Sequence, residues 1–124
     1  MKITKINEKE IVFDNGNTLT YLHEQDCCEH VFADFKNLQV LTKLFHNSMN
    51  SNDLDFEEDL QNYIYKIKDV GFEIEDKNGI RLFVSCYNYQ NGYYSDELKL
   101  EYNKLKEQSQ IIIDITDCVR DELD

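Results

Sequence analysis

Residues 70–87 read Val-Gly-Phe-Glu-Ile-Glu-Asp-Lys-Asn-Gly-Ile-Arg-Leu-Phe-Val-Ser-Cys-Tyr, and this stretch decides the fold class. Apolar and polar side chains alternate on both sides of Asn78-Gly79, which is the period of a β-strand with one buried face. Asn-Gly readily adopts the positive φ angles of a tight hairpin turn. The stretch therefore predicts two antiparallel strands joined by that turn.

Two further Asn-Gly pairs, Asn15-Gly16 and Asn91-Gly92, also lie between apolar runs. Each predicts another hairpin turn, and the second would join the long strand of residues 80–87 to the next strand. The run of isoleucines near the C-terminus predicts a buried strand. The predicted strands cover residues 2–6, 10–14, 18–23, 70–75, 80–87, 96–102 and 111–115.

Two helices are predicted between the halves of the sheet. Asp34 can cap a segment in which Leu38, Leu41 and Phe45 recur at helical spacing. A second helix is predicted from about Asp53 to Tyr63, and Thr116 is expected to cap a short helix in the tail. The fold prediction is one α+β domain over residues 1–124, an antiparallel β-sheet of about 5–7 strands built from Asn-Gly hairpins with one or two inserted helices.

Length and composition limit the kinds of protein that this sequence can encode. Its 124 residues are 31% charged and 41% hydrophobic, which is typical of a single globular domain. No apolar run approaches the roughly 20 residues of a membrane helix, and the N-terminus lacks the apolar run of a secretion signal. We therefore expect a protein of the cytoplasm, where thiols stay reduced.

The net charge of −12 disfavours direct binding to nucleic acid and suits a basic protein partner. Solubility alone is the alternative explanation of this acidity. A dense acidic run begins the second predicted helix, where it either complements the helix dipole or faces a partner. The candidate partner-binding residues are Asp53, Asp55, Glu57, Glu58 and Asp59, and the tail adds Asp114, Asp117, Asp121, Glu122 and Asp124.

Residues 22–30 pack two of the four cysteines, two of the three histidines and three carboxylates into nine positions. Thiolate and imidazole are preferred zinc ligands, and a carboxylate can complete a tetrahedron or orient an imidazole. The spacing differs from a zinc finger, because no Cys-x-x-Cys pair is present. The candidate metal ligands are His23, Asp26, Cys27, Cys28 and His30.

Core packing is the alternative role for each thiol. One of the two adjacent cysteines is expected to be a small buried hydrophobe. Cys86 shares an apolar strand face and is expected in the core, although it is also a candidate distant ligand. Cys118 is expected to pack in the tail.

A metal- or thiol-dependent small enzyme is a further alternative, and in the thiol case Cys27 or Cys28 would be activated by His23 or His30. Three neighbouring carboxylates, Glu24, Asp26 and Glu29, would raise the pKa of such a thiol rather than lower it. The sequence contains no glycine-rich phosphate loop, nucleophile elbow or His-Glu-x-x-His motif. We therefore predict a protein without catalytic activity.

The segment 25–29, Gln-Asp-Cys-Cys-Glu, followed by Gln-Asn-Gly-Tyr-Tyr-Ser at 90–95, resembles a family of small proteins of phages and mobile elements. The resemblance spans about residues 2–102, with Gln90 in place of the usual serine and Cys86 where an aromatic is common. A recurrent Cys-Cys pair beside a histidine implies a structural zinc ion.

The chain also looks like an anti-CRISPR protein. This likeness implies a phage-encoded inhibitor in the bacterial cytoplasm that docks on a type II CRISPR effector nuclease and blocks loading of target DNA. Such nucleases hold nucleic acid in positively charged channels, which an acidic protein can occupy. From the net charge we expect no direct contact with nucleic acid, and from the lack of a long apolar run we expect none with a membrane. A metal-free acidic interaction protein is the remaining alternative.

Overall fold

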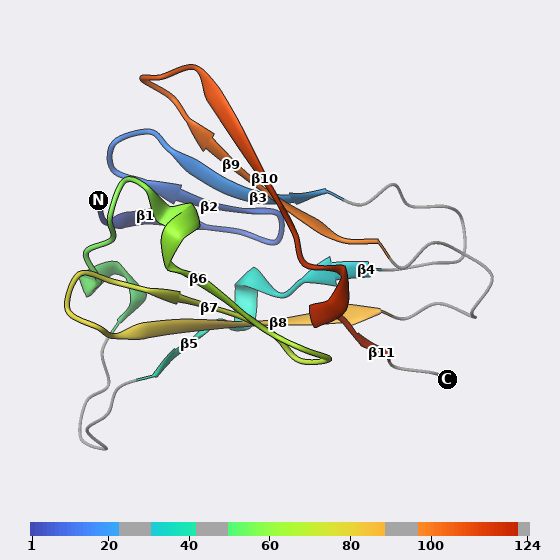
Figure 1. Cartoon of the computed structure of the whole chain (residues 1–124). Coiled ribbons are helices and arrows are strands. Elements are labelled where there is room, and N and C mark those ends of the chain that lie inside the picture. The colour runs from blue at the N-terminus through green and yellow to red at the C-terminus, as the bar shows by residue number, and fades with distance from the viewer. Residues whose placement is uncertain (23–30, 42–49, 89–96, 122–124) are drawn as a thin grey trace.

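The computed structural model describes residues 1–22, 31–41, 50–88 and 97–121, which form eleven strands and four short 3-10 helices (Figure 1). The strands are β1 (Ile3–Ile6), β2 (Glu10–Phe13), β3 (Thr18–Leu22), β4 (Val31–Ala33), β5 (Gln39–Leu41), β6 (Ile64–Ile67), β7 (Gly71–Glu75), β8 (Arg81–Asn88), β9 (Lys99–Lys104), β10 (Ser109–Asp114) and β11 (Arg120–Asp121). The 3-10 helices are η1 (Phe35–Asn37), η2 (Ser51–Asp53), η3 (Leu60–Tyr63) and η4 (Thr116–Cys118).

The strands form two sheets that face each other (Figure 1). The five-stranded sheet has the order β1-β2-β3-β9-β10. The six-stranded sheet has the order β11-β8-β7-β6, with β4 and β5 also paired to β8. All pairs are antiparallel except β11 with β8. The antiparallel sheet prediction is confirmed, but the described residues form an all-β fold rather than the predicted α+β fold.

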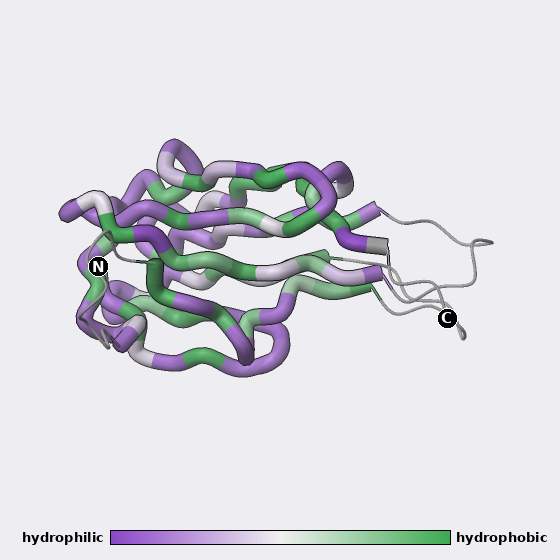
Figure 2. The backbone as a smooth tube through the Cα atoms, turned by 90° about the horizontal axis from the view of Figure 1, so that it is seen from below, coloured by the Kyte–Doolittle hydropathy of each residue, from purple (hydrophilic) through white to green (hydrophobic). Residues whose placement is uncertain are grey.

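One hydrophobic core joins the two sheets. Inward-facing residues of both sheets are buried in a single cluster, including Phe13 and Leu100 from one sheet and Phe72 and Val84 from the other. Strand alternation places polar residues between them, so that green and purple segments alternate along the tube in Figure 2. Each sheet therefore buries one face against the other, as in a β-sandwich.

The first two predicted Asn-Gly hairpins are confirmed. Gly16 has a φ of 90° between β2 and β3, and Gly79 has a φ of 79° between β7 and β8. The third hairpin prediction is wrong, because β8 and β9 belong to different sheets. The Asn91-Gly92 pair itself lies outside the described residues. Strand β9 instead pairs with β3 and β10.

The helix predicted after Asp34 is wrong over its described part. Only Phe35–Asn37 form a 3-10 turn, and β5 then pairs with β8 in the register Val40↔Leu82. Residues 31–41 thus run along the edge of β8, where strand pairing satisfies their backbone groups. Tertiary pairing has overridden the helical spacing of the apolar residues. The remainder of that prediction, residues 42–49, lies outside the described part of the chain.

The helix predicted over residues 53–63 is also wrong. Leu54 and Phe56 are buried at alternate positions, which is the pattern of extended backbone, and Leu60 begins the 3-10 helix η3. The predicted tail helix is only the three-residue η4, followed by β11. Four strands escaped prediction, β4, β5, β6 and β11. The turns before β7 and β10 lack Asn-Gly and use Asp69 and Gln108 at positive φ.

The isoleucine run is an edge strand rather than a buried strand. Strand β10 pairs with β9 alone, and its burial alternates along its length. The Ile112 side chain is 50% exposed. The run of apolar residues therefore predicted the strand correctly but wrongly predicted that it is buried.

A buried polar network fixes the end of the sandwich beside η3. The Tyr102 hydroxyl donates to the carbonyl of Glu58 at 2.6 Å and accepts from the Asn17 side-chain amide at 2.9 Å. The Asn17 side-chain oxygen accepts from the backbone of Leu105 at 3.0 Å. Both Tyr102 and Asn17 are buried, so these partners replace the water that the polar groups lose.

We expect substitution of Gly71 by alanine to destabilise the protein severely. A Cβ at Gly71 would overlap the backbone carbonyl oxygen of Val84 within the β7–β8 ladder. The free energy of unfolding in urea should fall by about 3 kcal/mol. The control Gly79→Ala strains only a positive-φ turn, and its Cβ would lie 3.7 Å from Glu75, so that it should cost about 1 kcal/mol. Equal losses in the two variants would contradict the close approach.

We expect Tyr102→Phe to lower the free energy of unfolding by about 1–3 kcal/mol, because it leaves buried polar groups of Asn17 and Glu58 unpaired. Burial raises the pKa of the Tyr102 hydroxyl to about 12. The unfolded phenol ionises from about pH 10, so this residue's contribution is lost as the pH rises from 10 through 12. Urea titrations across this range should therefore show a steeper loss of stability in the wild type than in Tyr102→Phe. Parallel losses would refute this assignment.

Candidate functional site: the acidic segment

Residues 53–59, here called the acidic segment, run from the last residue of η2 to the residue before η3 and cross one end of the sandwich (Figure 1). Its backbone is held by several partners. Phe56 exchanges two hydrogen bonds with Met1, both 2.7 Å long, and the Asp55 carbonyl accepts from Lys77 at 2.8 Å. The segment is therefore attached to β1 and to the β7–β8 turn.

Apolar side chains anchor the same segment in the core. Leu54 and Phe56 are fully buried, and the Phe56 ring packs edge-on against Phe13 with 5.8 Å between centroids. Asp76, itself buried, accepts from the backbone of Asp55 at 3.3 Å and from Asn78 and Ile80 in its own hairpin. The buried side chains of Leu54 and Phe56 thus fix the backbone of the segment, and the acidic residues next to them lie at the surface.

Two of the five acidic side chains serve the structure. Asp55 binds the N-terminal ammonium at 2.9 Å and lies 3.8 Å from the Lys77 ammonium. The hydrogen bond from the N-terminal ammonium lowers the pKa of the Asp55 carboxyl. Asp59 accepts a hydrogen bond from the Asn62 side chain at 3.0 Å. These two residues are therefore less available to a partner.

The other three carboxylates, those of Asp53, Glu57 and Glu58, have no ion pair or hydrogen bond with any residue in the described part of the chain. Asp53 and Glu58 are exposed, and Glu57 is half-buried. Many other acidic residues of the surface are neutralised by a cation within 4.0 Å. These ion pairs are Glu8–Lys36, Glu73–Arg81, Glu75–Arg81, Glu97–Lys99 and Glu107–Lys104.

The described tail acids Asp114 and Asp117 lie apart from the acidic segment (Figure 1). Asp114 accepts hydrogen bonds from the backbone and hydroxyl of Thr116, which lower the pKa of its carboxyl. Lys66 reaches the Asp114 carbonyl at 3.5 Å, so a cation lies beside this part of the tail. Strand β6 separates η3 from the tail in Figure 1. Asp117 and Asp121 lie in η4 and β11, whereas Glu122 and Asp124 lie outside the described residues.

All five predicted metal ligands, His23, Asp26, Cys27, Cys28 and His30, lie outside the described residues. The strand ends that flank them are described, and each lies beside a strand end that flanks residues 89–96. Leu22 pairs with Lys99, and Val31 pairs with Asn88. The described strands that precede and follow residues 23–30 and 89–96 therefore have these ends at the same end of the sandwich (Figure 1).

Cys86 and Cys118 are buried free thiols. Burial raises the pKa of both thiols, which opposes the thiolate form that a zinc ligand requires. The predicted core role of Cys86 is confirmed by its complete burial. Among residues that the structure describes, no group of three or more histidine, cysteine, aspartate or glutamate side chains is arranged to hold a metal ion.

A hollow of about 250 Å³ lies beside β3 and β4. It is lined by Glu8, Tyr21, Phe32, Ala33, Asp34 and Lys36. The Lys36 ammonium bonds to the Glu8 carboxylate at 2.7 Å, so these two charges neutralise each other. The Glu8 carboxylate is therefore paired with a cation, whereas those of Asp53, Glu57 and Glu58 have none among the described residues.

Sequence reasoning found the acidic residues but missed the groups that position them. Asp76 and Tyr102 act through bonds to residues that are distant in the chain. A usable signal was present for Asp76, since an aspartate two residues before Asn-Gly is typical of a side chain that accepts from its own turn. Tyr102 carried no comparable signal.

Comparisons with known proteins locate the chain in one family. A family model described as a domain of unknown function, DUF7448, matches residues 1–100. No curated protein and no solved structure matches the chain. No helix in the described part of the chain is long and apolar enough to cross a membrane. Because the family model covers most of the sequence, the chain belongs to the DUF7448 family.

Proposed function

We propose that this protein is a non-enzymatic inhibitor that binds the basic surface of a nucleic-acid-binding protein. The observation that carries the proposal is the acidic segment, in which Asp53, Glu57 and Glu58 lack cations while their backbone is fixed. Fixed charges lose little conformational entropy on binding, and complementary charge speeds association. The net charge of −12 adds long-range attraction to a basic partner.

The candidate partner is a type II CRISPR effector nuclease, as the likeness to anti-CRISPR proteins implies. This partner has the required chemistry, since it holds its nucleic acids in positively charged channels. An acidic protein docked in or beside such a channel would compete with the phosphates of target DNA. The proposed location is the cytoplasm of a bacterial host, and a phage gene is the proposed origin.

We expect the triple variant Asp53→Lys, Glu57→Lys, Glu58→Lys to weaken binding to the guide-loaded nuclease by at least about tenfold, because attraction becomes repulsion. The matched control reverses Glu10, Glu101 and Glu107, which lie on the five-stranded sheet or its last turn, and changes the net charge equally. This control should change the dissociation constant by less than about threefold. Titration calorimetry at two salt concentrations measures the dissociation constants of the triple variant and of the control. An assay of DNA binding by the nuclease measures inhibition.

Two results would overturn the proposal. Equal weakening by both triple variants would show that total charge matters and that the acidic segment does not. The absence of binding between the wild-type protein and the nuclease at low salt would show that this nuclease is not the partner. Inhibition of the nuclease without stoichiometric binding would favour an enzyme.

We also propose a structural zinc ion held by ligands from among His23, Asp26, Cys27, Cys28 and His30. The support is the ligand chemistry of these residue types, which the sequence places within eight consecutive positions. A bound ion would add folding free energy to loops that join the two sheets. The described Cys86 is unsuited to the ligand set because its thiol is buried in the core.

We expect about one zinc per chain in tag-free protein, measured by elemental mass spectrometry. The double variant Cys27→Ser, Cys28→Ser should lose the metal and melt at a lower temperature. The control Cys118→Ser should retain the metal, because Cys118 is a buried thiol of η4. Protein purified without chelator and free of zinc would contradict the site.

A further inference from the structure

Strand β10 is an edge of the five-stranded sheet, and in the described part of the chain no strand pairs with its outer side. Ile115 donates to the Leu98 carbonyl at 3.0 Å, which makes this pair a hydrogen-bonded pair of the antiparallel ladder. Such pairs alternate with non-hydrogen-bonded pairs. The backbone groups of Gln110, Ile112 and Asp114 therefore point away from β9.

The other long edges carry features that block pairing with a further strand. Strand β1 has a register shift between Ile3 and Lys5. One lysine, Lys2, directly precedes this strand and another, Lys5, lies within it. Strand β6 carries Lys66 in its middle. Bulges and edge lysines are the usual protection against edge-to-edge association. Strand β10 has six residues, and no lysine, proline or bulge interrupts its register with β9.

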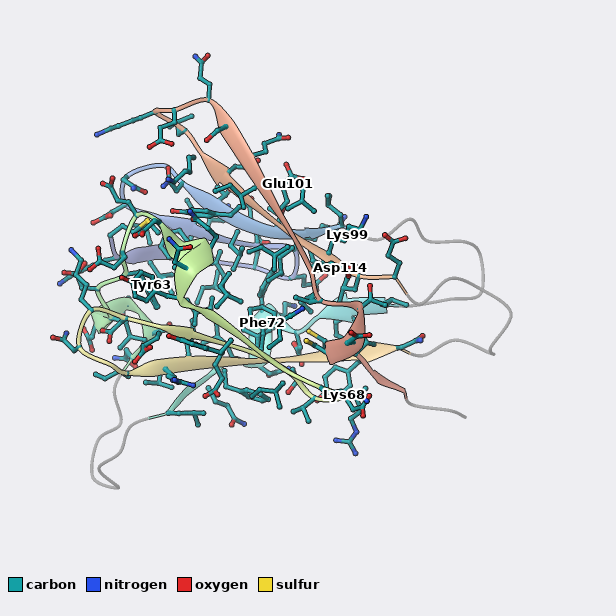
Figure 3. All side chains as sticks on the ribbon, viewed as in Figure 1. Tyr63, Lys68, Phe72, Lys99, Glu101 and Asp114 are labelled. Atoms are coloured by element: carbon teal, nitrogen blue, oxygen red, sulfur yellow. The ribbon has the colours of Figure 1, made fainter. Side chains whose placement is uncertain are left out.

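The β9–β10 hairpin, residues 99–114, is electrically neutral in an otherwise acidic protein. Three lysines, Lys99, Lys104 and Lys106, balance Glu101, Glu107 and Asp114. Figure 3 shows Lys99, Glu101 and Asp114 on this part of the sheet. A second copy of the chain can therefore approach β10 without the repulsion that the net charge of −12 would cause elsewhere.

We infer that β10 pairs with β10 of a second copy, antiparallel and about a two-fold axis at Ile112. The outward backbone groups allow several registers. In this register Gln110, Ile112 and Asp114 of each copy all hydrogen-bond to the other copy. Gln110 then lies opposite Asp114 of the second copy, so that an amide donor faces a carboxylate. The result is a continuous ten-stranded sheet from two five-stranded sheets.

The side chains of β10 suit this register. The Ile112 side chain, 50% exposed in one copy, lies beside its own symmetry mate. On the core side, half-buried Ile111 lies opposite half-buried Ile113 of the second copy. Cross-strand β-branched pairs of this kind stabilise a sheet. The long Lys66 side chain, which reaches the Asp114 carbonyl at 3.5 Å, must move aside.

Sedimentation velocity of the full chain tests this inference. We expect a reversible monomer–dimer equilibrium between about 10 µM and about 1 mM, favoured by salt because the remaining repulsion is screened. Ile112→Lys should weaken dimerisation by at least about tenfold. The control Thr4→Lys, at an exposed position of the opposite edge β1, should leave it within about twofold.

Amide exchange gives a second readout that is specific for the register. Exchange of the Gln110 and Ile112 amides should slow with rising protein concentration, whereas that of Ile111, already directed at β9, should change little. A monomer at every concentration, or a dimer unaffected by Ile112→Lys, would overturn the inference. Binding of the basic partner by the acidic segment is measured separately, so failure of one proposal is distinguishable from failure of the other.

Discussion

The structure depends on the closure of one end of the sandwich by the acidic segment. Burial of Leu54 and Phe56 covers apolar surface that the two sheets leave at this end, and backbone bonds to Met1 and Lys77 tie the segment to both. Burying two such side chains contributes on the order of 4 kcal/mol. The Tyr102 hydroxyl then holds the carbonyl of Glu58, so the same closure also orders the acidic residues.

This closure links the core to the surface charge. Around the buried residues Leu54 and Phe56 successive side chains point to opposite sides, so that Asp53, Asp55 and Glu57 are presented outward. Glu58 is exposed where the chain approaches η3. A long helix would have spread the same carboxylates around its axis, with the first turn close to its own dipole. The like-charge repulsion between the carboxylates is tolerated because the core contacts and the Asp55 ion pairs hold the backbone.

The sequence predicted the local elements better than their arrangement. Period-two alternation and Asn-Gly turns marked the hairpins at Gly16 and Gly79, since both signals act between neighbouring residues. The helix predictions failed because apolar spacing of three or four residues also fits a short strand followed by a turn, as in residues 34–41. Whether β9 joined β8 or β3 depended on contacts between distant residues, which no local pattern encodes. The acidic residues of the site were visible in the sequence, but Asp76 and Tyr102, which position them, act over long separations.

Charge is distributed unevenly over the described residues, and this uneven distribution is the physical basis of the two different contact surfaces that we propose. The acidic segment retains carboxylates without cations, whereas the β9–β10 hairpin balances three lysines against three acids. Under the two proposals, a basic partner would be attracted to the first surface by a field that weakens with salt, while strand pairing at the second would require short-range backbone bonds and become easier with salt. The two contacts would therefore respond oppositely to ionic strength. They also lie on separate elements, so that a β10-paired dimer would keep both acidic segments available and would bind a basic surface bivalently.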